Sequence, residues 1–177
     1  MSSALIRELK TLCLSQQPAL RLAVAESLTG GRVQAAITAV SGASGFFLGG
    51  ITAYSVDQKV KILGVKRAAA TKVNGVSAEV AAQMAQGAVR LFGADIAVAT
   101  TGYAERATTQ NVDEAFAYWA IAHRLSPRRW RILSGRVVCP ELNRTEVQAV
   151  VTEVVLSEWV AYLKTVKSSP PRSKSLT

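Results

Sequence analysis

Residues 20–31 read LRLAVAESLTGG, an apolar run followed directly by Glu, Ser, Leu, Thr and two glycines. The run has the length of a short buried strand, and the glycines allow the chain to turn into a helix. Such a turn exposes a hydroxyl at the end of a sheet and directs the amides of a new helix toward whatever lies there. The simpler alternative is an N-cap, in which Ser27 or Thr29 binds those amides. Both interpretations predict a strand followed by a helix.

Around this stretch, segments with helical spacing of apolar residues alternate with short strand-like runs. We predict helices at 4–17, from Thr29 to about Val40, at 56–63, at 78–92 between Ser77 and Gly93, and from about Asn143 onward. We predict strands at 21–26, 46–55, 94–102, 116–124 and 129–139, with a bulge or close approach at the Gly-Gly pair of the second. Strands that alternate with helices and then form a hairpin imply a layered α/β domain with a mixed sheet.

Composition narrows the class of protein. The chain of 177 residues is 49% hydrophobic and 19% charged, which suits one well-packed globular domain. Its two cysteines, Cys13 and Cys139, are far apart, and His123 is the single histidine, so a disulfide scaffold and a metal site are not expected. The N-terminal segment mixes charges into its apolar positions, unlike a signal peptide or membrane anchor. We therefore expect a cytoplasmic protein with no membrane association.

The formal net charge is +9 at pH 7, and its distribution matters more than its size. Part of the charge lies in the last residues, where Ser, Pro and Lys predominate, and we predict a folded domain at 1–166 and a disordered basic tail at 167–177. Another part lies in five arginines between Arg124 and Arg136. Without a recognisable docking motif around them, we interpret these as a solvated strand edge, so that a nucleic-acid partner is not expected.

The candidate catalytic and binding residues lie at the ends of predicted strands. In open α/β sheets, ligands bind beyond the carboxyl ends of the strands. Two predicted strands end in the hydroxyl-rich segments ESLTGG and TTGY, and a third leads into the helix that carries Lys59. Ser27, Lys59 and the corner at 100–102 therefore converge on one predicted cleft. The phosphate-loop, dinucleotide-binding and serine-elbow glycine motifs are all absent from the sequence.

These segments resemble a known family. AESLTGG, SGASGFFLGGITAYSVDQKVKILGV, VSAEVAAQMAQGA and GADIAVATTG occur in the order seen in the C-terminal domain of the CinA family of competence-damage-inducible proteins. The same domain occurs alone as the nicotinamide mononucleotide deamidase. The resemblance covers about residues 5 to 165. It implies a three-layer α/β/α domain, a homodimer, no metal or organic cofactor, and hydrolysis of nicotinamide mononucleotide to nicotinic acid mononucleotide and ammonia.

The resemblance also implies site residues. The family's AESCTGG motif places a nucleophilic serine at Ser27, and its YSN-x-x-K motif, which is similar to YSVDQK here, places a catalytic tyrosine at Tyr54 and an activating lysine at Lys59. A lysine acts as a base only when its surroundings lower its pKa. We expect amides at Thr29, Gly30 and Gly31 to hold the oxyanion, and Thr101 and Gly102 to contact substrate.

Two departures from the family pattern affect the substrate end of the cleft. The family continues its Thr-Gly corner into a glycine-rich loop, TGIAGPGGG, whereas this chain reads TGYAERATTQNVDEAF, without a glycine after Gly102. The family's G-D-R-x-x-[VI]-R segment is similar to ELNRTEVQ, which keeps Arg144 as a candidate phosphate ligand but has Gln148 at the second basic position.

Two hypotheses about function therefore stand. The first is an amidohydrolase for nicotinamide mononucleotide or a related amide, because Ser27 and Lys59 are both present. The second is a catalytically silent relative that binds a ligand or partner through the same cleft, because the glycine loop is lost. Fold alone does not choose between them.

Overall fold

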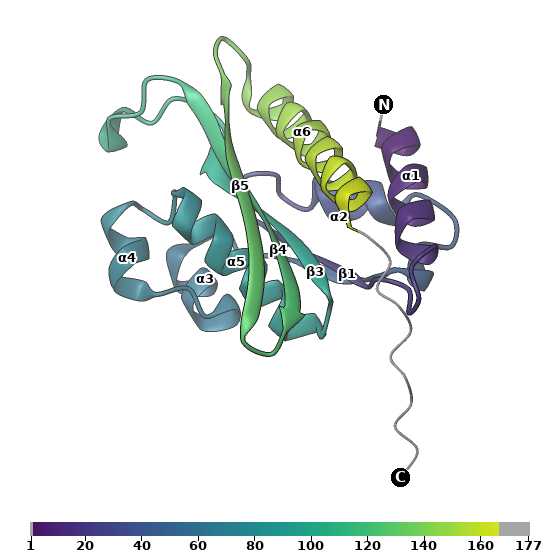
Figure 1. The fold of residues 1–177 in the computed structure, drawn as a ribbon. Coiled ribbons are helices and arrows are strands. Elements are labelled where there is room, and N and C mark those ends of the chain that lie inside the picture. Colours follow the sequence, from purple (N-terminus) through teal and green to yellow (C-terminus); the bar gives the residue numbers. More distant parts are fainter. Residues whose placement is uncertain (1, 167–177) are drawn as a thin grey trace.

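The computed structural model describes residues 2–166 and consists of one mixed sheet with helices on both faces (Figure 1). The sheet has the order β2-β1-β3-β4-β5, with β1 at Leu22–Glu26, β2 at Phe47–Thr52, β3 at Ile96–Tyr103, β4 at Ala115–Ser126 and β5 at Arg129–Cys139. β1 runs parallel to β2 and β3, and β4 is antiparallel to both β3 and β5. The predicted mixed sheet and its terminal hairpin are confirmed.

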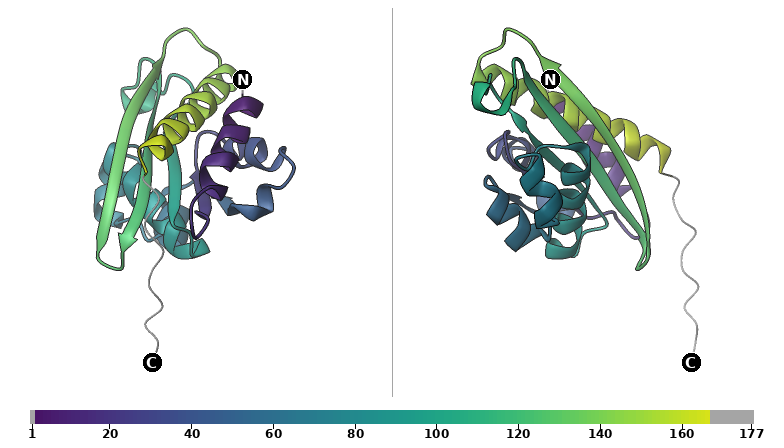
Figure 2. Two further views of the ribbon diagram at one scale, coloured as in Figure 1. Left: turned by 45° about the vertical axis from the view of Figure 1, so that its right-hand side comes forward. Right: turned by 90° about the vertical axis from the view of Figure 1, so that its left-hand side faces the viewer.

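Helices form the outer layers. On one face lie α1 (Ser2–Leu14), α2 (Arg32–Thr38) and α6 (Arg144–Thr165); on the other lie α3 (Val56–Leu63), α4 (Arg67–Lys72) and α5 (Ala78–Phe92). Helices α1 and α6 are in contact, as the turned views show (Figure 2). Leu22 and Val24 of β1 belong to the core under α1 and α6, while Ala23 and Ala25 belong to the core under α5. This arrangement confirms the α/β/α domain.

The ends of α5 and the start of α6 follow the predicted signals, whereas α1 ends at Leu14, three residues before its predicted end. Ser77 caps α5 through its side chain, and Gly93 ends that helix in the left-handed conformation, as expected. Asn143 forms a capping box at the start of α6. The helix predicted from Thr29 begins instead at Arg32, because residues 28–31 form a turn. The short helix α4 was not predicted, since its six residues carry no clear apolar period.

The glycine pair of β2 is a point of close approach, as predicted. A Cβ atom at Gly49 would lie 2.8 Å from the ring of Phe92, and one at Gly50 would lie 2.6 Å from Gln34 Oε1. The pairing of β1 with β2 also shifts register between Leu22 and Ala23. Glycine is needed here because the α2 and α5 layers press on the edge strand from both sides.

The basic segment and the histidine have structural surroundings. Arg136 of β5 stacks on the ring of Phe116, with 4.5 Å between the guanidinium carbon and the ring centroid. His123 is buried, with its Nδ1 2.7 Å from the hydroxyl of Tyr162 on α6. Burial lowers the pKa of His123, with Asp95 acting against this shift and Arg131 adding to it. Arg136 thus joins β5 to β4 beside the carboxyl end of β3. His123 joins β4 to α6 near the start of β3, at the sheet end opposite the candidate site.

The predicted tail at 167–177 lies outside the described residues. Within residues 2–166, the structure contains no helix long and apolar enough to cross a membrane. Cys13 and Cys139 are free and buried, so the described part of the chain holds no disulfide. Burial, reinforced by Asp95, raises the pKa of the Cys13 thiol to about 12, which makes it unreactive at neutral pH.

Candidate active site

A cleft of about 420 Å³ opens at the carboxyl ends of β1 and β3. It has contributions from five parts of the chain: the turn after β1, the start of α3, the segment before α5, the loop after β3 and the first residue of α6. Its lining residues are Ser27, Leu28, Tyr54–Val56, Lys59, Asn74, Val76, Gly102–Ala107 and Arg144. The cleft thus has the position expected for a ligand site in this class of fold. It brings together five of the nine predicted site residues: Ser27, Tyr54, Lys59, Gly102 and Arg144.

Lys59 is the most unusual group in the cleft. It lies on α3 and is only 2% exposed, yet no carboxyl group is among its hydrogen-bond partners in the described chain. Its Nζ donates to the carbonyl of Gly75 at 3.1 Å and to Thr101 Oγ1 at 2.9 Å. Burial lowers the pKa of Lys59 to about 8, because desolvation penalises the ammonium form. A substantial neutral fraction near neutral pH is what a lysine base requires.

Thr101 is placed behind the lysine and does not line the cleft. Its hydroxyl donates to the Gly75 carbonyl at 2.7 Å, so its oxygen is the acceptor for Lys59 Nζ. A Cβ atom at Gly75 would lie 3.0 Å from Lys59 Nζ, and Gly75 has φ +71°, so glycine is required for this approach. Thr101 was predicted to contact substrate, but it is fully buried and holds the lysine instead.

Ser27 follows β1 directly and is 5% exposed, with the cleft in front of it. Lys59 lines the same cleft from α3. Among the described residues, the hydrogen bonds of Lys59 Nζ go to Gly75 and Thr101 rather than to Ser27. The structure therefore brings the predicted pair to one cavity without joining them by a hydrogen bond. Catalytic hydrogen bonds are often longer before substrate binds, so this arrangement does not exclude the pair.

Glu26, which directly precedes Ser27, has a structural role. Its carboxyl group is fully buried and accepts hydrogen bonds from the amides of Gly31, Val33 and Gln34 at 2.9, 3.2 and 2.9 Å. It therefore caps α2, a helix whose own N-cap residue, Gly31, has no side chain to do so. Sequence reasoning missed this role, because the capping group precedes the helix by six residues instead of standing at its start.

This cap corrects the roles predicted for the turn. The amide of Gly31 is bound to Glu26, and the amide of Gly30 donates to the Ser27 carbonyl at 3.2 Å, so neither is a free donor for an oxyanion. Thr29 is fully buried, and its Oγ1 lies 2.8 Å from Thr100 Oγ1. In residues 2–166, the backbone amides of Leu28 and Thr29 have no hydrogen-bond acceptor, and Leu28 lines the cleft, so the role predicted for the Thr29 amide stays a prediction.

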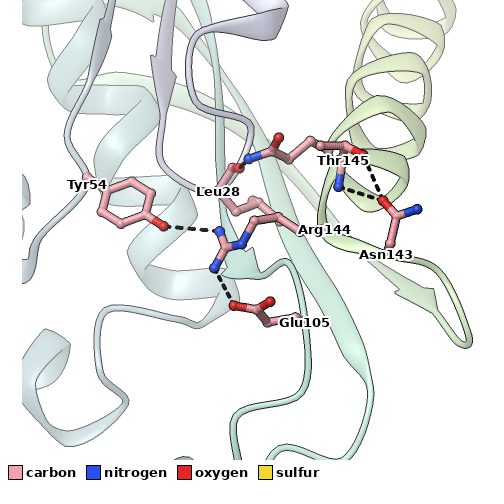
Figure 3. Close-up of polar contacts among 7 residues, drawn as sticks. Leu28, Tyr54, Glu105, Asn143, Arg144 and Thr145 are labelled. Carbon is pink, nitrogen blue, oxygen red and sulfur yellow. Dashed lines mark hydrogen bonds and ion pairs between the residues drawn. The ribbon is translucent and has the colours of Figure 1, made fainter.

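Arg144 projects from the start of α6 between Tyr54 and Glu105 (Figure 3). Its Nη2 lies 2.6 Å from Glu105 Oε1, and its Nη1 donates to the Tyr54 hydroxyl at 3.4 Å. The hydrogen bond to Glu105 is the main reason that the pKa of Arg144 is raised, with Tyr54 contributing less. The guanidinium predicted to bind phosphate is thus already paired with a carboxylate from the loop after β3. Tyr54 is 60% exposed at the cleft mouth.

A scan of the sequence against known families decides the relationship. The CinA C-terminal domain matches residues 5–163, nearly all of the described chain. The chain belongs to the CinA C-terminal domain family. The resemblance of the sequence motifs is confirmed.

Individual relatives agree with this assignment. The chain is 49% identical over 85 residues to a CinA-like protein of Chlorobium limicola and 51% identical over 83 residues to one of Picosynechococcus. These alignments cover 48% and 47% of this chain but 20% of each relative. The aligned part of this chain thus spans about a fifth of the length of the curated CinA-like proteins that it matches.

Solved structures match the fold over most of its length. The competence damage-inducible protein A of Klebsiella pneumoniae superposes with a TM-score of 0.84 at 25% identity, covering 94% of this chain and 99% of that one. The competence/damage inducible protein CihA of Agrobacterium tumefaciens gives 0.79 at 28% identity, with coverages of 93% and 96%. The α/β architecture is therefore shared with CinA superfamily proteins.

Compared with the CinA motifs, the loop after β3 is rebuilt in this chain. Residues 103–107 line the cleft, a single 3-10 turn follows at Thr108–Gln110, and Ala107 pairs with Val112 in an isolated bridge. The segment between β3 and β4 is thus irregular and lies beside the cleft. Gly102 remains glycine because a Cβ atom there would lie 2.3 Å from the Phe116 carbonyl oxygen. Among the side chains of this loop, Glu105 lines the cleft and contacts Arg144.

Gln148, at the second departure from the CinA motif, joins two elements near the cleft. Its Nε2 donates to the Leu28 carbonyl at 2.8 Å, and its Oε1 accepts from Arg32 Nε at 3.1 Å. The side chain therefore holds the turn after β1 to α6. It supplies no positive charge for a phosphate.

Proposed function

We propose that this CinA-family protein is an amidohydrolase in which Ser27 is the nucleophile and Lys59 is the base. The observation that carries the proposal is a buried lysine with a pKa of about 8, which shares a cleft with a serine at the end of β1. A serine hydroxyl needs a nearby base to become nucleophilic, and a desolvated lysine can serve as one. With this pKa, about a tenth of Lys59 is neutral at pH 7.

The hydrogen bonds of Lys59 support this role. A neutral amine has two N–H bonds and one lone pair. The Thr101 hydroxyl proton is directed to the Gly75 carbonyl, so Gly75 and Thr101 both act as acceptors for Lys59. The two N–H bonds of neutral Lys59 are then occupied, and its lone pair is left to take a proton. Ser27 is the hydroxyl that follows β1 on the wall of the same cleft.

The reaction proceeds by acyl transfer. Lys59 takes the Ser27 proton as Oγ attacks the carboxamide carbon, and the carbonyl oxygen becomes an oxyanion near the Leu28 amide. The proton passes from Lys59 to the departing nitrogen, and ammonia leaves as the tetrahedral intermediate collapses to an ester on Ser27. Water then attacks this ester as Lys59 accepts its proton. Lys59 passes this proton to the departing Ser27 Oγ as the second tetrahedral intermediate collapses, which releases the carboxylic acid and restores the serine and the neutral lysine.

Nicotinamide mononucleotide is the substrate that the family resemblance predicts. Tyr54, Gly102 and Arg144 line the cleft and are the residues available to contact it. The absence of a metal or organic cofactor, the homodimer and the cytoplasmic location also remain predictions from the sequence. The competing proposal is a silent relative that binds through this cleft, and the Glu105–Arg144 ion pair is the observation that favours it.

Purified protein incubated with nicotinamide mononucleotide tests the proposal. We expect ammonia and nicotinic acid mononucleotide in equal amounts, because hydrolysis of one amide gives one of each. Turnover by a mechanism that releases nicotinamide instead would contradict amide hydrolysis. If the protein binds nicotinamide mononucleotide saturably but releases no ammonia from it or from its nucleoside, the protein is a catalytically silent relative.

A further inference from the structure

Both anion-binding elements expected at this cleft are occupied by carboxyl groups of the chain itself. One is the turn at the start of α2, whose amides were expected to face a ligand. The other is Arg144, the candidate phosphate ligand. Each was identified from a motif, and each has an internal partner that the motif does not reveal. The two pairings occur in different elements and are independent observations.

The first pairing, between the Glu26 carboxyl group and the amides at the start of α2, is a fixed part of the fold. The Glu26 carboxyl group is fully buried and takes the amides of Gly31, Val33 and Gln34. Withdrawing it would leave these donors and a buried carboxyl group unsatisfied, which is costly. A phosphate therefore has no access to these amides.

The second pairing is at the cleft mouth. Glu105 and Arg144 have side chains 58% and 44% exposed, so the pair itself contributes little to stability. Its effect is on the ligand: the 2.6 Å contact places a negative charge where a phosphate on Arg144 would have to lie. A phosphate must displace Glu105 or bind beside it, and either costs binding energy.

The cavity beyond Glu105 is acidic as well. A groove of about 740 Å³ shares Glu105 and Arg106 with the cleft and is also lined by Asp113, Glu114 and Glu141. The groove lining thus has four carboxyl groups and one guanidinium, in a chain whose net charge is +9. Within residues 2–166, these acids do not form a group of three or more that could hold a metal ion. Acidic side chains thus outnumber basic ones in the groove beyond the cleft mouth.

We propose that the site prefers a carboxamide that carries no phosphate over its phosphorylated form, and that Glu105 sets this preference. The inference rests on the amidohydrolase proposed above. The reacting amide lies between Ser27 and Lys59, and the far end of the substrate, uncharged or cationic, faces Glu105. Arg144 serves to hold Glu105 in this position.

Nicotinamide riboside and nicotinamide mononucleotide form a suitable pair of probes, because they differ only by the phosphate. We expect kcat/KM of the wild-type protein to be about tenfold higher for the nucleoside, the size of one charge interaction at a protein surface. The Glu105→Gln substitution removes the charge and keeps the shape. It is expected to raise kcat/KM for the nucleotide about tenfold and to lower that for the nucleoside by less than about threefold. A wild-type preference for the nucleotide, or an unchanged ratio in Glu105→Gln, would overturn the proposal.

Glu8→Gln is the matched control. Glu8 forms a similar half-exposed ion pair with Lys164, at 2.7 Å, but on the α1–α6 layer. Its replacement is expected to leave both values of kcat/KM unchanged.

Calorimetric binding of both probes to Ser27→Ala protein separates this inference from the proposed function. The inference is supported if Ser27→Ala protein binds the nucleoside more tightly than the nucleotide and if this difference is smaller in the Ser27→Ala/Glu105→Gln double variant. This result supports the inference even when the wild-type protein releases no ammonia. Binding of neither probe, or equal binding of both, contradicts it.

Discussion

Replacing Lys59 by methionine is expected to lower kcat about 100- to 10,000-fold, the usual contribution of a general base. Methionine fills a similar volume and cannot accept a proton. Thr101 still donates to the Gly75 carbonyl without Lys59, so no backbone oxygen is orphaned. The protein should therefore stay folded, and its free energy of unfolding should not fall, since a desolvated amine is lost. Ammonia release and thermal unfolding measure the two effects.

Lys61→Met is the control, because Lys61 is exposed on the same helix. It should retain wild-type kcat. If Lys59→Met and Lys61→Met release ammonia equally fast, Lys59 is not the base.

Replacing Ser27 by alanine is expected to have the largest effect, a loss of about 10⁶-fold in kcat. The nucleophile cannot be replaced by the remaining groups of the cleft, and only binding and oxyanion stabilisation persist. Ser27 is nearly buried, so the loss of one hydroxyl should change stability little. Steady-state and single-turnover ammonia release are the appropriate measurements.

Ser55→Ala provides the comparison within the same cleft. The Ser55 hydroxyl caps α3 by accepting from the Gln58 amide at 3.3 Å. Its loss should cost about 1 kcal/mol of stability and little activity. The opposite pattern, with Ser55→Ala inactive and Ser27→Ala active, would indicate that the nucleophile is Ser55, the N-cap residue of α3.

Much of the fold was predictable because its signals are local. The strand at 22–26 follows from four consecutive apolar residues, 22–25, before Glu26 and a turn, and the ends of α5 follow from Ser77 and Gly93. The helix after Ser27 was predicted three residues too early. A turn and a helix start have similar composition in a segment such as SLTGG, and the position of the helix start depends on which amides the Glu26 carboxyl group binds.

The candidate site was less predictable, because its decisive contacts join distant residues. The ends of the predicted strands indicated that Ser27 and Lys59 share a cleft, which both residues line, and the motif resemblance supplied their roles. The partner of Arg144 could not be predicted: Glu105 is 39 residues away, in a loop whose path depends on how β3 ends. The same holds for Thr101, which turned out to support Lys59 from behind the cleft. No sequence pattern distinguishes a hydroxyl that faces the ligand from one that faces the base.

The pH dependence of kcat/KM between pH 6 and 9.5 tests most directly the central claim, that a desolvated Lys59 acts as the base. Only neutral Lys59 can accept the Ser27 proton, so kcat/KM should rise with pH below the pKa of Lys59 and level off above it. With this pKa at about 8, the rise from pH 6 to pH 8 should be about fiftyfold. Tyr54→Phe should keep the same midpoint, since Tyr54 contacts Arg144 instead of Lys59. A flat profile, a fall in kcat/KM from pH 6 to pH 8, or a midpoint that disappears in Tyr54→Phe would contradict the account.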